Sequence, residues 1–130
     1  MDFFLQLQHN DILFIDSTHV IKIGGEVNYL FLEVLPRLNK GVIVHVHDIF
    51  LPFEYPKEWV IQRHRFWTEQ HLLHAFLICN NCFEVLWAGN YLCTKYPEKL
   101  RTLFPSYNLE SISPGSFYIR KKEIPVGGIN

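Results

Sequence analysis

Two segments of the chain are apolar at nearly every position and end in acidic and imidazole side chains. The first is Asp11-Ile-Leu-Phe-Ile-Asp16-Ser-Thr-His19, and the second is Gly41-Val-Ile-Val-His45-Val-His47-Asp48. Continuous apolar runs of this length are typical of parallel strands covered by helices on both faces. We therefore predict buried strands over residues 11–16 and 42–47.

Between these two strands the apolar residues recur at helical spacing. The stripe consists of Val27, Leu30, Phe31, Val34, Leu35 and Leu38, followed by Asn39-Lys40-Gly41 as a helix stop. A strand, a helix and a second strand of these lengths form a right-handed unit in which the strands run parallel. The pattern thus predicts an α/β domain.

The rest of the chain alternates between helical and extended patterns. We predict the tail of a helix in 1–10, a proline-rich loop at 51–56, one helix over 57–78, a strand over 83–86, a short helix or turn over 97–104, a last strand over 116–120 and a loose tail at 125–130. Residues 91–96 fit either a helix or a strand. The last strand alternates apolar and polar positions as an antiparallel edge strand does. All of these elements belong to a single domain, 1–130.

Candidate chemistry gathers where the two buried strands end. Asp16, His19, His47 and Asp48 all follow a strand, and parallel sheets place their ligands beyond the carboxyl ends of the strands. Asp16, His47 and Asp48 provide oxygen and nitrogen ligands suited to a divalent metal. His47, or His19 on its loop, can instead act as a general base. Asp16 can also simply cap the loop at 17–19.

The remaining histidines allow a further interpretation. His45 and His47 project to the same face of their strand, as in hydrolases that bind a metal through two such histidines. His45 lies deeper in the strand, and we expect it to be structural. His71 and His74 are one helical turn apart and are expected at the surface.

Composition and charge exclude several classes of protein. Hydrophobic residues make up 48% of the chain, charged residues 19%, and the net charge is -1. Such a chain folds, and it lacks the electrostatic footprint of a protein that binds nucleic acid or an anionic membrane. We expect no signal peptide and no membrane span. Three cysteines, Cys79, Cys82 and Cys93, do not pair evenly and are expected to be reduced thiols of a cytoplasmic protein.

Several segments together carry a family resemblance that covers nearly the whole chain. They are Asp11 to His19, Leu35-Pro-Arg-Leu-Asn-Lys-Gly41-Val-Ile-Val, His47-Asp48-Ile-Phe-Leu-Pro52, Tyr55-Pro56, Trp67-Thr-Glu69-Gln70, Leu72-Leu73-His74-Ala75-Phe76 and Gly115-Ser-Phe-Tyr-Ile-Arg120. With these segments the chain resembles the C-terminal half of a class I S-adenosylmethionine-dependent methyltransferase.

The resemblance implies a partial Rossmann-like sheet. The family order is 3-2-1-4-5-7-6 with the last strand antiparallel, and this chain would supply strands four to seven. The first three strands, with the glycine-rich loop for S-adenosylmethionine, would lie before Met1. The resemblance also implies a divalent metal on Asp16, His47 and Asp48, with His19 or His47 taking the proton of the acceptor hydroxyl.

The function implied is that of the acceptor-side half of an O-methyltransferase of a small molecule or sugar, inactive alone. The alternative is a non-catalytic remnant of the fold that serves as an interaction or oligomerisation module. In either case an exposed sheet edge can pair with a second copy of the chain or with the missing N-terminal half. A metal-dependent hydrolase that uses His45, His47 and Asp48 is a third interpretation.

Overall fold

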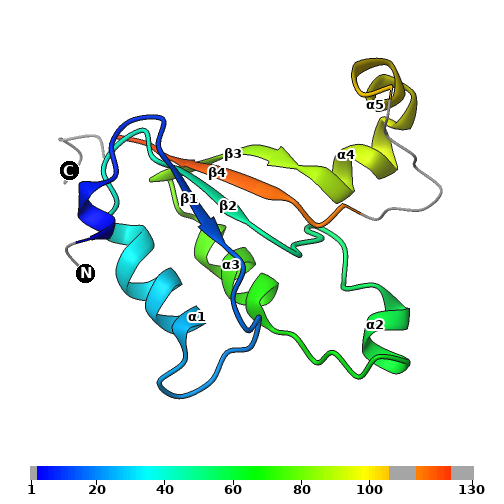
Figure 1. The fold of residues 1–130 in the computed structure, drawn as a ribbon, viewed down its shortest axis with the longest axis horizontal. Helices are drawn as coiled ribbons and strands as arrows, with labels where there is room; N and C mark the ends of the chain where they lie inside the picture. The colour runs from blue at the N-terminus through cyan, green and yellow to red at the C-terminus, as the bar shows by residue number, and fades with distance from the viewer. Residues whose placement is uncertain (1–2, 106–113, 124–130) are drawn as a thin grey trace.

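The computed structural model of the chain describes residues 3–105 and 114–123. Helical and extended elements alternate along it, as expected for an α/β protein (Figure 1). The helical elements are η1 (Phe4–Gln6), α1 (Glu26–Tyr29), η2 (Leu30–Val34), η3 (Leu35–Arg37), α2 (Lys57–Ile61), α3 (Glu69–Leu77), α4 (Gly89–Lys95) and α5 (Pro97–Leu103). The strands are β1 (Ile12–Ile15), β2 (Ile43–Val46), β3 (Phe83–Ala88) and β4 (Phe117–Lys121). The predicted tail at 125–130 lies outside the described residues.

Within the described residues, four strands form one mixed sheet in the order β1-β2-β4-β3. β1 pairs with β2 in parallel, with Ile12 opposite Ile43 and Ile15 opposite Val46. This pairing confirms the strand–helix–strand unit predicted from the first part of the sequence. The unit matters for function because it brings the carboxyl ends of β1 and β2 side by side.

The last strand, β4, runs antiparallel to both of its neighbours, β2 and β3. Its predicted direction is therefore confirmed. The edge position predicted from its alternation is wrong, whereas the strand order 4-5-7-6 implied by the resemblance also places the last strand between two others. β4 lies between two strands, and Phe117, Ile119 and Lys121 are buried on one of its faces. Alternation of apolar and polar residues marks a strand with one covered face, and an interior strand can have that property as well as an edge strand.

The helix predicted between the first two strands is present and runs without interruption through α1, η2 and η3. It departs from α geometry toward its end, where Leu35 donates its backbone N–H to Leu30 in a π turn and a 3-10 turn follows. Pro36 stands in that 3-10 turn and has no N–H to continue an α-helix. Its buried residues include Val27, Phe31 and Val34, as the apolar stripe predicts.

The single helix predicted over 57–78 is wrong, because two helices, α2 and α3, occupy this range. Between them Arg65 donates its N–H to the Trp59 carbonyl, and the N–H groups of Thr68 and Glu69 both go to the His19 carbonyl. At the start of α3 these N–H groups therefore bond to a carbonyl distant in sequence, and not to carbonyls of a preceding helical turn. The undecided segment 91–96 lies mostly in α4, and Pro97 opens α5.

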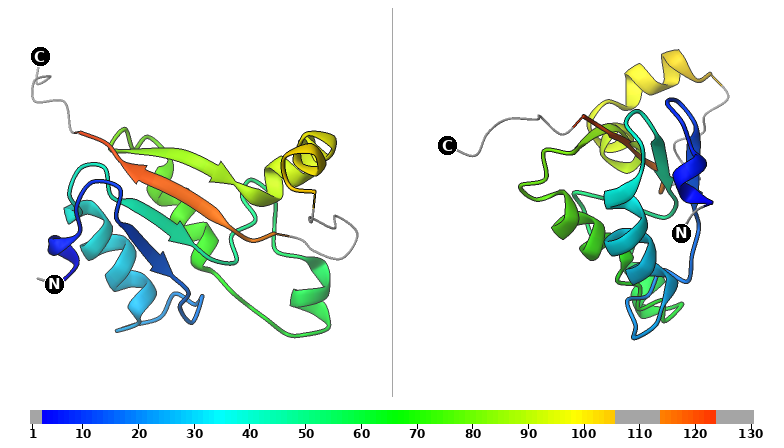
Figure 2. Two further views of the ribbon diagram at one scale, coloured as in Figure 1. Left: turned by 45° about the horizontal axis from the view of Figure 1, so that its top comes forward. Right: turned by 90° about the vertical axis from the view of Figure 1, so that its left-hand side faces the viewer.

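The hydrophobic core lies between one face of the sheet and the helices α1 to η3 and α3, which lie on the same side of it (Figure 2). Buried on the sheet side are Ile15, Val44, Val46, Phe117 and Ile119, and on the helix side Val27, Phe31, Val34, Leu35 and Leu73. These contacts fix β1 and β2 against their helices. They thereby hold the strand ends, where the candidate site residues lie, in place.

The opposite face of the sheet is open along β1. Ile12 and Phe14 are 58% and 55% exposed, and Phe14 lies beside the stacked rings of His45 and Tyr118. Helices were expected on both faces; along β1 the described residues supply them on one face only. The outer edge of β1 also pairs with no strand in the part of the chain that the structure describes. No helix among these residues has both the length and the apolar character needed to cross a membrane.

Candidate functional site

The carboxyl ends of β1 and β2 bring the four predicted site residues together. His47 donates its backbone N–H to the Ile15 carbonyl at 2.9 Å, which places the residues after the two strands beside each other. Asp16 Oδ1 lies 3.4 Å from His19 Nε2 and 3.6 Å from His47 Nδ1. Asp48 approaches the same two rings, with Oδ1 3.4 Å from His47 Nδ1 and Oδ2 4.0 Å from His19 Nε2. The cluster therefore consists of two carboxylates that alternate with two imidazoles.

The structure adds a fifth member, Glu69, which the sequence did not predict as a site residue. Its side chain is fully buried at the start of α3, and Oε2 accepts a hydrogen bond from His19 Nδ1 at 2.7 Å. The other oxygen accepts a hydrogen bond from the Ser17 hydroxyl at 3.0 Å. An acidic residue in the first turn of a helix is commonplace, so the sequence offered little reason to single it out. Its partner lies 50 positions earlier in the chain.

Glu69 determines which nitrogen of His19 can react. An ionised carboxylate only accepts hydrogen bonds, so the proton of the neutral imidazole resides on Nδ1. The lone pair is then on Nε2, which faces Asp16 and Asp48. This is the arrangement that a buried carboxylate gives to a histidine serving as a general base.

The charges around His19 also determine its basicity. Burial by itself lowers the pKa of His19, but the hydrogen bond and charge of Glu69, joined by the charges of Asp48 and Asp16, outweigh burial and raise the pKa above its ordinary value. The imidazolium is thereby stabilised. A proton delivered to Nε2 would face the carboxylates of Asp16 and Asp48, while Glu69 holds the proton on Nδ1.

The backbone that carries His19 is held in an unusual conformation. His19 has a φ of 60°, and Asp48 at the end of the other strand has a φ of 56°. Residues other than glycine seldom adopt this left-handed region, and they do so where surrounding contacts impose it. The His19 carbonyl accepts hydrogen bonds from the N–H groups of both Thr68 and Glu69, at 2.8 and 3.0 Å. The start of α3 thus anchors the loop after β1.

Gly115 supports the loop after β2 from the other side. It accepts a hydrogen bond from the Ile49 N–H at 2.8 Å, and a Cβ atom at this position would lie 2.7 Å from Asp48 Cα. Such a contact is closer than real Cβ atoms make, so the residue at this position must be glycine for the two segments to meet as they do. The segment that leads into β4 therefore helps to position the Asp48 carboxylate.

The predicted metal ligands, Asp16, His47 and Asp48, converge without forming a coordination site as they stand. His47 Nδ1 is buried and makes no hydrogen bond, and it lies 3.4 to 3.6 Å from one oxygen of each carboxylate. Among the described residues no group of three or more His, Cys, Asp or Glu side chains has an arrangement that could hold a metal ion. Carboxylate oxygens and an imidazole nitrogen are donor atoms that suit a divalent cation. His47 Nδ1 makes no hydrogen bond that a cation would have to displace.

Asp16 does not act as a cap for the loop at 17–19. That loop is held by Ser17, whose hydroxyl accepts the His19 N–H, and by Glu26, which accepts the Thr18 N–H at 2.9 Å. The Asp16 side chain makes no hydrogen bond to this loop within the described residues and is half exposed beside the two imidazoles. The structure thus places Asp16 in the cluster.

The other histidines lie away from this cluster or serve packing. His45 is stacked on Tyr118, with ring centroids 4.1 Å apart, and burial lowers its pKa, with the charge of His47 adding to the effect. Its stacked position agrees with a structural role. His71 and His74 are exposed on α3, and His71 lies 3.8 Å from Glu54. None of the three cysteines forms a disulfide in the structure.

An aromatic wall borders the cluster on the side of α2. Trp67 stacks on the His19 ring with centroids 4.1 Å apart, and its edge-on neighbours are Tyr55 and Trp59. The loop between β2 and α2 is held over this region by Gln70, which is buried and accepts the Phe50 N–H. One side of the site is therefore apolar, and the other is charged.

Comparison of the chain with protein-family models, curated proteins and solved structures gives no match.

Proposed function

We propose that this chain is the acceptor-side half of an S-adenosylmethionine-dependent O-methyltransferase that acts on a small molecule or sugar in the cytoplasm. The observation that carries the proposal is the buried His19–Glu69 pair at the carboxyl edge of β1 and β2. When the ring is neutral, Glu69 holds the proton on Nδ1, and the lone pair of Nε2 then faces two carboxylates at the place where sheets of this kind bind their ligands.

The strand order supports the same proposal. β1-β2-β4-β3 with β4 antiparallel corresponds to the order 4-5-7-6 that the sequence resemblance implies. The order is informative because β4 enters between two strands that precede it in the chain, which a simple meander does not do.

In this proposal His19 takes up a proton, and its neighbours hold its ring in position. S-adenosylmethionine, when bound, would supply the methyl group. His19 Nε2 would accept the proton of the acceptor hydroxyl as the oxygen bonds to the methyl carbon and the carbon–sulfur bond of the cofactor breaks to leave S-adenosylhomocysteine. Glu69 would stabilise the resulting imidazolium. Trp67 and Glu69 hold the His19 ring in one orientation. This orientation matters because methyl transfer depends on the alignment of the reacting groups.

A divalent metal belongs to the proposal as a second element, and Asp16, His47 and Asp48 would have to shift from their arrangement in the structure to ligate it. A cation there would polarise the acceptor hydroxyl and lower its pKa. We expect Mn²⁺ to bind the full chain and Asp16→Ala to weaken its binding at least tenfold, as seen in calorimetric titration. Asp11→Ala, which removes an exposed carboxylate at the other end of β1, serves as the control. Equal Mn²⁺ binding by all three proteins would show that this cluster is not the metal site.

The partner that we propose is a cofactor-binding methyltransferase half, or a second copy of this chain, that covers the outer edge of β1 and the open face beside it. An unpaired strand edge next to exposed apolar side chains, here Ile12 and Phe14, is a surface on which another strand or helix can pack. The site would then lie between the two halves.

The test is release of S-adenosylhomocysteine from S-adenosylmethionine with a panel of sugar and small-molecule acceptors. The chain is assayed alone and after addition of a cofactor-binding half of a class I methyltransferase. We expect turnover only in the mixture. Turnover by the chain alone would contradict the need for a second half.

A second candidate function is that of a non-catalytic interaction module, which the open face along β1 favours. Stable association with a second half or second copy, without turnover and without binding of S-adenosylmethionine at millimolar concentration, would support this alternative and count against the methyltransferase.

A further inference from the structure

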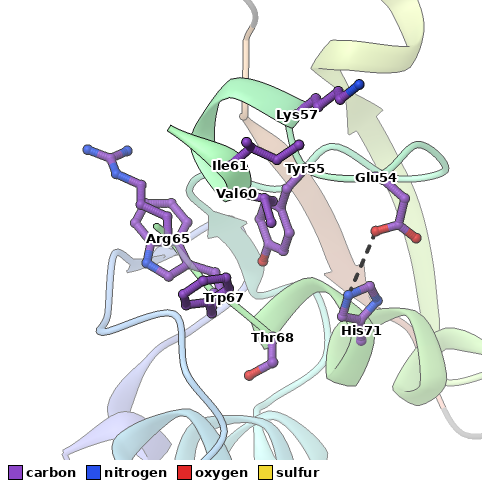
Figure 3. A pocket seen from close by; sticks show the side chains of 10 residues that line it. Glu54, Tyr55, Lys57, Val60, Ile61, Arg65, Trp67, Thr68 and His71 are labelled. Atoms are coloured by element: carbon purple, nitrogen blue, oxygen red, sulfur yellow. Dashed lines mark ion pairs between the residues drawn. The ribbon is translucent and has the colours of Figure 1, made fainter. Parts of the chain in front are cut away.

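A hollow of about 490 Å³ lies between the loop before α2, α2 itself and the start of α3, and Trp67, which stacks on His19, is one of its lining residues (Figure 3). Its volume is in the range of sites for small ligands. Its apolar lining includes Val60, Ile61 and Phe66, and Phe66 and Ile61 are largely exposed there. An exposed apolar concavity next to a polar site is a place for the body of a ligand.

Arg65 is the distinctive charge of this hollow. Its guanidinium lies over two indole rings, 4.7 Å from the centroid of Trp59 and 4.8 Å from that of Trp67. The two rings are nearly perpendicular to each other, so contact with both restricts the position of the guanidinium. Such cation–π contacts leave its N–H donors available. No carboxylate among the described residues lies within ion-pair distance of Arg65. By contrast Arg63, two positions earlier, is paired with Glu58 at 2.6 Å.

The other charges at the hollow leave Arg65 unneutralised. Glu54 lies 3.8 Å from His71, which Figure 3 marks as an ion pair, and Lys57 stands at the rim. A guanidinium held between two indole rings without a carboxylate partner is suited to bidentate recognition of a carboxylate or phosphate.

We infer that this hollow binds the anionic end of the methyl acceptor, a small molecule that combines an apolar body with a carboxylate or phosphate group. That the ligand is a methyl acceptor rests on the proposed function. That it combines an apolar body with an anionic group rests on the residues that line the hollow. The His19 ring and the Arg65 guanidinium both lie within 5 Å of the Trp67 ring centroid. No more than about 9 Å therefore separates the centre of the His19 ring from the Arg65 guanidinium carbon, a distance that one small molecule can span.

The test measures binding of simple probes to the full chain without cofactor. The probes are phenyl phosphate, phenylacetate and benzyl alcohol, a neutral analogue. We expect one or both anions to bind at millimolar concentration and benzyl alcohol to bind at least tenfold more weakly. The anion that binds more tightly distinguishes a phosphorylated from a carboxylated acceptor. Shifts of the Trp67 indole N–H signal in NMR spectra locate the probe, and Trp87, on β3, is the internal reference.

Two neighbouring arginines give a matched pair of variants. Arg65→Gln should weaken binding of the anion about tenfold or more, the loss expected for a charge-assisted hydrogen bond, whereas Arg63→Gln should change it less than twofold. Arg65→Lys keeps the charge but not the fork and should recover part of the loss, which separates recognition from a folding defect. Equal losses in the two glutamine variants, equal binding of benzyl alcohol, or no binding of either anion at tens of millimolar would overturn the inference.

These results are separable from the test of methyl transfer. Anion binding that depends on Arg65, without any turnover in the mixture of halves, would leave the ligand site standing and remove the methyltransferase. Turnover on neutral acceptors that is unaffected by Arg65→Gln would support the methyltransferase and remove the anion site.

Discussion

Replacement of Glu69 by alanine is expected to lower the free energy of unfolding by about 3 to 5 kcal/mol, the cost of removing one partner from a buried ion pair. The side chain is 0% exposed and accepts hydrogen bonds from His19 and Ser17. Its loss leaves the His19 imidazole without the group that compensates its burial, and it leaves a cavity at the start of α3. Urea denaturation of the wild type and the variant measures the difference.

The matched control is Glu98→Ala. Glu98 is also in the first turn of a helix, but it is exposed, and among the described residues its side chain pairs only with Arg101. Its replacement should change the free energy of unfolding by no more than about 0.5 kcal/mol. If the two alanine variants were equally stable, the His19–Glu69 pair could not be the structural centre of the site.

The same pair makes stability depend on pH in a defined direction. Because the pKa of His19 is raised on folding, its contribution is complete below the unfolded value of about 6.5 and is lost as the pH rises through the folded value. In buffers containing EDTA, the wild type should therefore lose more stability between about pH 6 and pH 9 than His19→Gln does. An identical loss in both proteins would mean that His19 gains no charge stabilisation from Glu69, Asp48 and Asp16.

The part of the fold that the sequence predicts best is the part with the simplest physical signal. β1, β2 and the helix between them follow from buried apolar runs and one amphipathic stripe, and their parallel pairing follows from the length of the connection. Residues that end these strands necessarily meet. For that reason the sequence alone predicts that Asp16, His19, His47 and Asp48 lie close together.

The features that sequence reasoning missed depend on contacts between distant segments. The break between α2 and α3 arises because the His19 carbonyl, far away in sequence, accepts the N–H groups at the start of α3. Glu69 enters the site through the same connection. Periodicity cannot reveal such a break, since the apolar spacing of 57–78 is compatible with one long helix. The interior position of β4 likewise depends on its neighbours and not on its own alternation, and only the strand order implied by the family resemblance placed it there.

The largest effect on activity is expected at His19. In the mixture of the chain with a cofactor-binding half, His19→Gln should reduce kcat by about 10² to 10⁴, the usual contribution of a positioned general base. His47→Gln should have a smaller effect, because His47 Nδ1 makes no hydrogen bond and no buried carboxylate orients its ring as Glu69 orients His19. The measurement is kcat for S-adenosylhomocysteine release over a range of pH.

The pH profile separates a base from a structural histidine. Wild-type kcat should rise with pH through the raised pKa of His19, since only the neutral ring can accept the proton. Glu69→Gln keeps the size of the side chain and removes its charge, so the pKa of His19 should fall and the rise should move to lower pH. His9→Gln, a change at an exposed histidine outside the cluster, should leave the profile unchanged. A profile that moves with His47→Gln and not with Glu69→Gln would assign the base to His47 instead.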